Sequence, residues 1–316
     1  GQTGSGLGTY VGSLGWGFGW AGIAAALAGA VLLARRAPLR ALLLAAFPVA
    51  LFVYLVLQAR WFGRWLLPAY PALALLAAYG LARAAEAVRR PRARVAVLAA
   101  LTALVLAQPL AADIRSARVL GKTDTRAALR AYLVAAYPPE LRVAIEPAVP
   151  GRYYRVDPAG RDPAWLRRCS RGWSYPGPGR GRVCRRARPG QFVRPGGGLR
   201  ASAYHLVLDA GVIDAYRRNG YCAIATFSVV RDRALLTGRP GARAYYRRLE
   251  READLVRTFS PYDRGADPVD FDFDRSYDYG AAAYRRPGPL VRLYRLRGCR
   301  QGYGPPRERV PSARGL

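Results

Sequence analysis

Two arginines lie between long apolar segments, where a charge is costly, and they could bind a phosphate group. Arg60 and Arg64 lie between two long apolar runs, in the sequence RWFGRWLLP at positions 60–68. A charge next to a membrane-spanning segment is expensive unless it reaches the interface or serves a function. The planar arginine fork matches the oxygens of a phosphate group. These residues alone leave two interpretations open, a phosphate ligand and an interfacial anchor.

Alternating carboxylates form a second candidate, in the sequence DFDFD at positions 270–274. On a strand these carboxylates share one face and could hold a divalent cation. An Asp-x-Asp pair is also similar to that of metal-dependent nucleotide-sugar glycosyltransferases. In the alternative interpretation, the phenylalanines pack inward and the acids pair with arginines. We therefore assign no metal ligand and keep a divalent cation as a possible cofactor.

Other motifs fail on inspection. Gly121-Lys122-Thr123 resembles the end of a phosphate-binding loop, but Ser116 stands where that motif needs glycine. His205 is the only histidine, and no hydrolase signature surrounds it. The glycines between Gly4 and Gly19 follow no strand, which argues against a dinucleotide site.

The four cysteines are Cys169, Cys184, Cys222 and Cys299. Such cysteines fit an oxidising exterior, and three different pairings of them can form two disulfides. We predict Cys169–Cys184, which closes a loop, and Cys222–Cys299. The alternative is four free thiols. A zinc site is not indicated, because no two cysteines are closely spaced.

Charge divides the chain of 316 residues into two parts. The whole sequence is 52% apolar and yet has a formal net charge of +30. Residues 1–112 hold ten basic residues and one acid, whereas residues 113–316 hold forty basic and nineteen acidic residues, a net charge of +21. Together these values exclude a purely soluble enzyme.

Four charge-free stretches predict four transmembrane helices, at about 16–34, 41–59, 65–82 and 95–112. Eight arginines lie in the connecting segments 35–40 and 83–94, and two lie in 60–64. The positive-inside rule places the first two segments in the cytoplasm. Both termini and the segment after Asp113 are then extracytoplasmic, in a multi-pass protein of the cell membrane.

The second part is predicted as an external α/β domain over 113–301, followed by a disordered tail over 302–316. Helices are expected at Thr125–Ala136, capped by Thr123 or Asp124, and at 212–218 and 242–252. Strands are expected at 142–146, 204–208, 222–229, 255–259 and 290–296, with a long loop over 157–200.

The arginine segment resembles the late transmembrane segment of multi-spanning lipid-linked-sugar glycosyltransferases of the GT-C type, the group that includes protein O-mannosyltransferase-like and arabinosyltransferase-like enzymes. The resemblance continues in order over most of the chain. It runs through 124–126, 142–143, 220–222, 244–249, 271–274, 284–289 and 294–296. The chain is similar to the C-terminal half of an actinobacterial member of this group.

The resemblance implies a mechanism. Such enzymes transfer a sugar from a polyprenyl-phosphate donor to an acceptor in the cell envelope. Arg64 matches the arginine before the aromatic-Leu-Leu-Pro run, with Arg60 beside it, and both are expected to hold the lipid phosphate. The catalytic base is implied to be a carboxylate in a first external loop, expected upstream of Gly1.

Alternatives from other classes stay open. The strongest is a non-catalytic, membrane-anchored external domain that binds an anionic cell-wall polymer or an envelope protein, since a basic surface attracts polyanions. A transporter is less favoured, because no apolar span carries a charge. Expected partners are thus the lipid donor, the acceptor and membrane lipid, and no nucleic acid.

Overall fold

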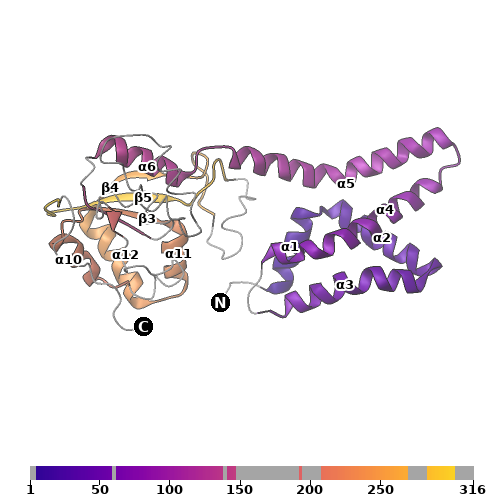
Figure 1. Ribbon diagram of the computed structural model, residues 1–316, viewed down its shortest axis with the longest axis horizontal. Helices are drawn as coiled ribbons and strands as arrows, with labels where there is room; N and C mark the ends of the chain where they lie inside the picture. The colour runs from indigo at the N-terminus through magenta and orange to yellow at the C-terminus, as the bar shows by residue number, and fades with distance from the viewer. Residues whose placement is uncertain are drawn as a thin grey trace, which may run out of the picture. The chain divides into compact units, whose positions relative to one another are not determined.

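The computed structural model describes residues 5–58, 62–137, 141–146, 192–193, 208–269 and 283–302. Among these residues the chain divides into two units, with the boundary between Gly121 and Lys122. We name them the helical unit and the sheet unit; Figure 1 labels their elements.

The helical unit consists of successive helices joined by short connections. Several segments are long and apolar enough to cross a membrane: α3, η1 together with α4, and the segment that begins with α5, while α1 and α2 count as a fourth if the bent pair is one span. The described elements are α1 (Gly6–Gly17), α2 (Trp20–Arg36), α3 (Pro38–Val56), the short 3-10 helix η1 (Gly63–Ala69), α4 (Tyr70–Glu86) and α5 (Pro91–Leu120).

The predicted first helix, 16–34, is wrong at its start, because α1 and α2 meet at an angle of 100°. Gly19 joins them with φ +83°, a conformation that favours glycine. The side chain of Gln108 on α5 forms hydrogen bonds with backbone groups at this break. Its Nε2 donates to the Gly15 carbonyl at 2.7 Å, and its Oε1 accepts from the Trp20 N–H at 3.1 Å. Within a membrane, freed backbone groups need such partners.

The predicted fourth helix, 95–112, is too short. Helix α5 begins at Pro91 and continues to Leu120. Asp113 and Arg115 end the apolar run, but a charged residue does not end a helix, and the helix stops only at the C-cap Gly121. The boundary predicted between 112 and 113 therefore falls inside α5.

Helices α2 and α4 approach each other closely at Gly29 and Gly80. A Cβ added to Gly29 would lie 1.9 Å from the Leu76 carbonyl oxygen, and one added to Gly80 would lie 2.6 Å from the Ala25 carbonyl oxygen. Small residues at a helix crossing allow this backbone-to-backbone approach. The pair forms the centre of the helical unit, where Ala26 and Leu76 are buried.

The sheet unit is a small α/β domain around one mixed sheet. The strand order is β2-β1-β3-β5-β4; β1 pairs in parallel with β2 and β3, and β5 pairs antiparallel with β3 and β4. The strands are β1 (Val143–Ile145), β2 (Phe192–Val193), β3 (Ala223–Phe227), β4 (Ala253–Phe259) and β5 (Val291–Leu296).

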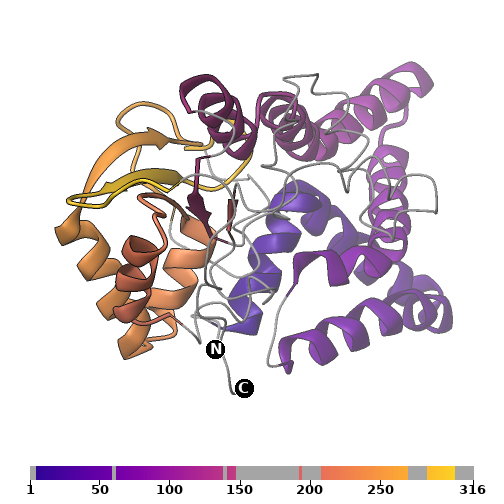
Figure 2. The ribbon, with the colours of Figure 1, turned by 60° about the vertical axis from the view of Figure 1, so that its left-hand side comes forward.

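Helices cover both faces of this sheet. As Figure 1 and Figure 2 show, α6 lies over one face, and α10, α11 and α12 lie over the other. Apolar side chains from both layers form the core of the unit. The helices are α6 (Thr125–Ala136), α10 (Gly211–Arg218), α11 (Ser228–Leu236) and α12 (Pro240–Glu252).

Most predicted elements of this unit are present. Helix α6 has the predicted bounds, and Asp124 is its N-cap, with the side chain accepting from the Arg126 N–H at 2.7 Å. The predicted strand 222–229 is wrong beyond Phe227, because α11 begins at Ser228. The predicted loop 157–200 contains the short strand β2, which pairs with β1. Of the predicted strand 204–208 only Leu208 is described, and it lies in no strand; the tail from 303 onward lies outside the described residues.

A disulfide joins Cys222, just before β3, to Cys299, just after β5. The Cα atoms lie 5.5 Å apart, and the residues are separated by 77 positions in the sequence. The predicted Cys222–Cys299 pair is confirmed, whereas Cys169 and Cys184 lie outside the described residues.

We expect the double substitution Cys222→Ala/Cys299→Ala to lower the free energy of unfolding by roughly 2–4 kcal/mol, because the cross-link removes entropy from the unfolded chain. Thermal unfolding in detergent, with and without a reductant, measures this effect. The reductant should destabilise the wild type by more than the double variant, which keeps only the predicted Cys169–Cys184 pair. Equal unfolding midpoints for the oxidised wild type and the double variant would contradict the prediction.

Candidate functional site

Arg64 is held at the turn between α3 and α4 by a firmly packed segment. Phe62 precedes η1 in an extended conformation, and its N–H donates to the hydroxyl of Tyr10 on α1 at 3.2 Å. Gly63 packs so closely on α1 that an added Cβ would lie 3.1 Å from Ser13 Oγ. Leu66 is buried with Tyr10. The backbone around Arg64 is therefore positioned by α1.

The guanidinium of Arg64 lies 5.0 Å from the centre of the Phe62 ring, a cation–π arrangement. Arg64 is exposed. Within the described ranges, no ion pair or hydrogen bond occupies its guanidinium. The donors of Arg64 are thus available to an anion from outside the described protein. Arg60, the other predicted ligand, lies outside the described residues.

A buried carboxyl group lies at the carboxyl end of β1. Glu146 is only 1% exposed. Its Oε2 accepts from the Phe227 N–H at 2.7 Å, and its Oε1 accepts from the Tyr246 hydroxyl at 2.6 Å. Burial raises the pKa of Glu146 to about 8, although both hydrogen bonds and the charge of Arg231 act in the opposite direction.

The position of Glu146 is typical of ligand sites, since α/β sheets bind ligands at carboxyl ends of parallel strands. However, protein donors occupy both oxygens of Glu146, and these bonds connect β1 with β3 and α12. We therefore interpret Glu146 as a group that positions these elements. The sequence showed only a glutamate at the end of a predicted strand, and nothing in that pattern indicated burial.

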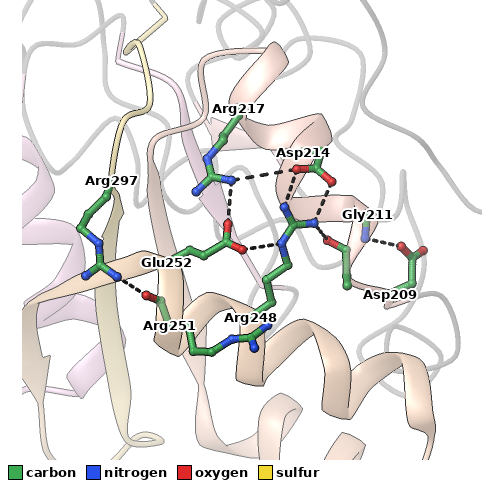
Figure 3. Close-up of polar contacts among 9 residues, drawn as sticks. Asp209, Gly211, Asp214, Arg217, Arg248, Arg251, Glu252 and Arg297 are labelled. Carbon is green, nitrogen blue, oxygen red and sulfur yellow. Dashed lines mark hydrogen bonds and ion pairs between the residues drawn. The ribbon is translucent and has the colours of Figure 1, made fainter.

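Arginine–carboxylate pairs fasten α10 to α12 (Figure 3). Arg248 donates to both oxygens of Asp214 at 2.7 and 2.6 Å and to Glu252 at 2.8 Å. Arg217 lies 2.6 Å from the other oxygen of Glu252. The hydrogen bonds from Arg248 are the main cause that lowers the pKa of both carboxyl groups. These carboxylates are ionised and engaged, which makes them poor proton acceptors.

Two segments that carry the sequence resemblance lie in contact. Thr125 N–H donates to the Pro287 carbonyl at 3.0 Å, and the Thr125 hydroxyl donates to the Pro289 carbonyl at 2.7 Å. Gly288, with φ +105°, packs against Thr125 so closely that an added Cβ would lie 2.1 Å from its Oγ1. The contact anchors the start of α6 beside the segment that leads into β5. In this structure, the motif residues at 125 and 287–289 therefore hold the start of α6 against the segment that leads into β5.

The possible cation segment 270–274 lies outside the described residues, as does His205, which was not assigned to a site. In the part of the chain that is described, no group of three or more His, Cys, Asp or Glu side chains could hold a metal ion.

The two units together define a broad class. The chain joins a set of helices that could span a membrane to a small α/β domain that contains a disulfide. No known protein family, curated protein or solved structure gives a significant match to this chain.

Proposed function

We propose that this chain belongs to an integral membrane glycosyltransferase, which transfers a sugar from a polyprenyl-phosphate donor to an acceptor outside the cytoplasm. The observation that carries the proposal is the presentation of Arg64. A charged residue with available donors stands on a packed turn at the end of two apolar helices. The resemblance of the surrounding sequence to lipid-linked-sugar glycosyltransferases supports the same role.

In this reaction the bond between the anomeric carbon of the sugar and the phosphate oxygen breaks, and its electron pair leaves with the phosphate. The hydroxyl oxygen of the acceptor forms the new bond to the anomeric carbon, and its proton passes to a carboxylate base. Negative charge on the lipid phosphate increases as the bond breaks. Arg64 would offset this charge with two parallel hydrogen bonds, and its ring contact with Phe62 would keep the fork oriented.

The charges at the two ends of α3 support an extracytoplasmic site. Helix α3 has 19 residues and therefore spans about 28 Å. Arg35, Arg36 and Arg40 lie at its first end, and Arg64 follows its second end. By the positive-inside rule, the end with Arg64 faces outward. The disulfide Cys222–Cys299 supports an oxidising location for the sheet unit.

We expect Arg64→Ala in the full-length enzyme to slow sugar transfer by a factor of about 10²–10³, as for the loss of one preorganised donor to a transition state. Arg64→Lys should also impair transfer, because an ammonium group cannot form the bidentate fork. The assay measures transfer of labelled sugar from a polyprenyl-phosphate donor at matched expression. Arg200→Ala serves as the control for lost charge.

The interfacial-anchor interpretation makes the opposite prediction for Arg64→Lys, since lysine also reaches the interface with its charge. Equal transfer rates for the wild type and Arg64→Lys would therefore contradict the assigned role of Arg64. If the wild type transferred no sugar from any polyprenyl-phosphate donor, the glycosyltransferase proposal itself would fail.

The arginine excess supports a second candidate, a domain that binds an anionic cell-wall polymer. In the sheet unit several carboxylates are engaged by arginines (Figure 3), while Arg239 at the N-cap of α12 and Arg243 and Arg247 on α12 are exposed. Such a surface attracts polyanions in a salt-dependent way. Polymer binding that survives in a protein without transferase activity would favour this candidate.

A further inference from the structure

Exposed arginines gather at the end of the helical unit opposite Arg64. They flank the α2–α3 and α4–α5 connections. Seven of them are exposed, namely Arg35, Arg36, Arg40, Arg89, Arg90, Arg92 and Arg94, and we call them the arginine cluster. The nearby carboxylate is Glu86, at the end of α4. It pairs with Arg83 at 2.5 Å and with Arg94 at 3.4 Å.

Glu86 also indicates that the end of α2 lies near the α4–α5 connection. Arg83 precedes it on α4, Arg94 comes from the first turn of α5, and Arg36 from the last turn of α2 acts on it electrostatically. One carboxylate therefore shares the charge of arginines from three helices. Within the described residues, Arg40, Arg90 and Arg92 have no ion pair.

The helix ends make this excess of positive charge less favourable still. Arg40 lies in the first turn of α3, whereas Arg90 is the N-cap of α5 and Arg92 lies in its first turn. Neither helix has a side-chain cap or an acidic residue in its first turn. The positive end of a helix dipole is stabilised by anions and destabilised by cations. Within the described part of the chain, no carboxylate pairs with Arg40, Arg90 or Arg92, so an external anion would stabilise their charges.

The location of the cluster identifies the anion. Membrane-spanning segments end at the level of the lipid headgroups, and the cluster stands at the ends of α2, α3, α4 and α5. Arginine forks match phosphate oxygens. Basic residues next to membrane helices bind anionic headgroups. The positive-inside rule accounts for basic residues near the ends of membrane helices. It does not account for arginines at the N-termini of α3 and α5, which have no side-chain cap.

We propose that the arginine cluster is a binding site for the phosphate headgroup of an anionic phospholipid. The headgroup phosphate would accept hydrogen bonds from arginines of both connections, together with backbone N–H groups at the starts of α3 and α5. Binding would hold the α2–α3 and α4–α5 connections together. This inference requires the helical unit to lie in a membrane, and it does not depend on glycosyl transfer.

The test uses the whole chain, purified in a neutral detergent and titrated with phosphatidylglycerol or with phosphatidylcholine of the same chain length. We expect the wild type to bind phosphatidylglycerol more tightly. The triple variant Arg40→Gln/Arg90→Gln/Arg92→Gln should lose about 100-fold in affinity, which corresponds to about 3 kcal/mol for three arginines near a headgroup. The matched control Arg218→Gln/Arg264→Gln/Arg300→Gln removes the same charge from exposed positions of the sheet unit and should keep the wild-type affinity.

Equal affinity of the wild type for the two lipids would overturn the proposal, and so would equal losses in the two triple variants. If the cluster variant does not fold, salt dependence in the wild type provides the test. Raising the salt from about 0.05 to about 0.5 M should weaken phosphatidylglycerol binding and leave phosphatidylcholine binding unchanged. Phosphatidylglycerol binding that is insensitive to salt would contradict the proposal. Sugar transfer is measured separately, so the failure of either proposal can be distinguished.

Discussion

Replacing Gly29 by leucine should separate α2 from α4 and destabilise the helical unit by at least about 3 kcal/mol. Even the first added carbon would lie 1.9 Å from the Leu76 carbonyl oxygen. That atom belongs to a helix backbone and cannot rotate away as a side chain could. Overpacking of this kind typically costs about 1–3 kcal/mol, and a clash with backbone exceeds that range. Gly80→Leu should act in the same way from the opposite helix.

The measurement is the midpoint of thermal unfolding in detergent, together with the monodisperse fraction on size exclusion. Ala28→Leu and Ala78→Leu are matched controls, because both alanines lie in the same two helices and are exposed. Both controls should unfold near the wild-type midpoint. If Gly29→Leu behaved like Ala28→Leu, close packing at Gly29 would not hold the helices together.

Segments governed by local physics were predictable from the sequence. Charge-free runs located α3 and α4, because apolar length is what a membrane span requires. Thr123 and Asp124 were the two predicted caps of α6, because a side-chain oxygen at the N-cap accepts from the first free N–H groups, and Asp124 is the cap. Counting the four cysteines left three pairings open, and Cys222–Cys299 was predicted because the pair Cys169–Cys184 would close the loop between them.

Features that depend on distant residues were not predictable. The break before Trp20 relies on Gln108, which lies 88 residues later in the sequence. Val229 and Val230 favour a strand, yet they lie in α11, which begins at Ser228. Val230 is buried there, and the Leu290 N–H donates to the Ser228 hydroxyl. Tertiary contacts override local propensity at both places.

The candidate site also combines features that could be predicted from the local sequence with features that depend on distant residues. The residue types around Arg64 indicated a phosphate ligand or an anchor, because they reflect local chemistry. The hydroxyl of Tyr10 that accepts from Phe62 comes from 52 residues earlier and could not be found by spacing. Likewise, the burial of Glu146 depends on Tyr246, 100 residues away.

The pH dependence of the sheet unit should be governed in large part by Glu146. Its pKa is about 8 in the folded protein, against an ordinary value of 4.5. Between these values the folded state holds a proton that the unfolded state has released, so unfolding releases a proton. Raising the pH therefore favours unfolding. The stabilising contribution of Glu146 is fully present below its pKa in the unfolded chain. It is lost as the pH rises through its pKa in the folded protein, which lowers the free energy of unfolding by about 3 kcal/mol from about pH 5 to pH 8.

Glu146→Gln should remove most of this dependence. The glutamine oxygen can accept from Phe227 N–H, and its amide can donate to the Tyr246 hydroxyl, so the hydrogen-bonded positions stay filled without a titrating group. The variant should match or exceed the stability of the wild type near pH 8. Other charged groups that act on Glu146 are Arg231 and Asp232, which the variant leaves in place.

Unfolding of the whole chain, followed by circular dichroism at both pH values, measures the effect. Asp263→Asn is the control, because Asp263 is an exposed carboxylate of the same unit. Its pH profile should match that of the wild type. Tyr246→Phe provides an independent test: loss of the hydroxyl that stabilises the ionised carboxylate should raise the pKa of Glu146 further and move the destabilisation to higher pH. Identical pH profiles for the wild type and Glu146→Gln would show that Glu146 does not carry a proton into the folded state.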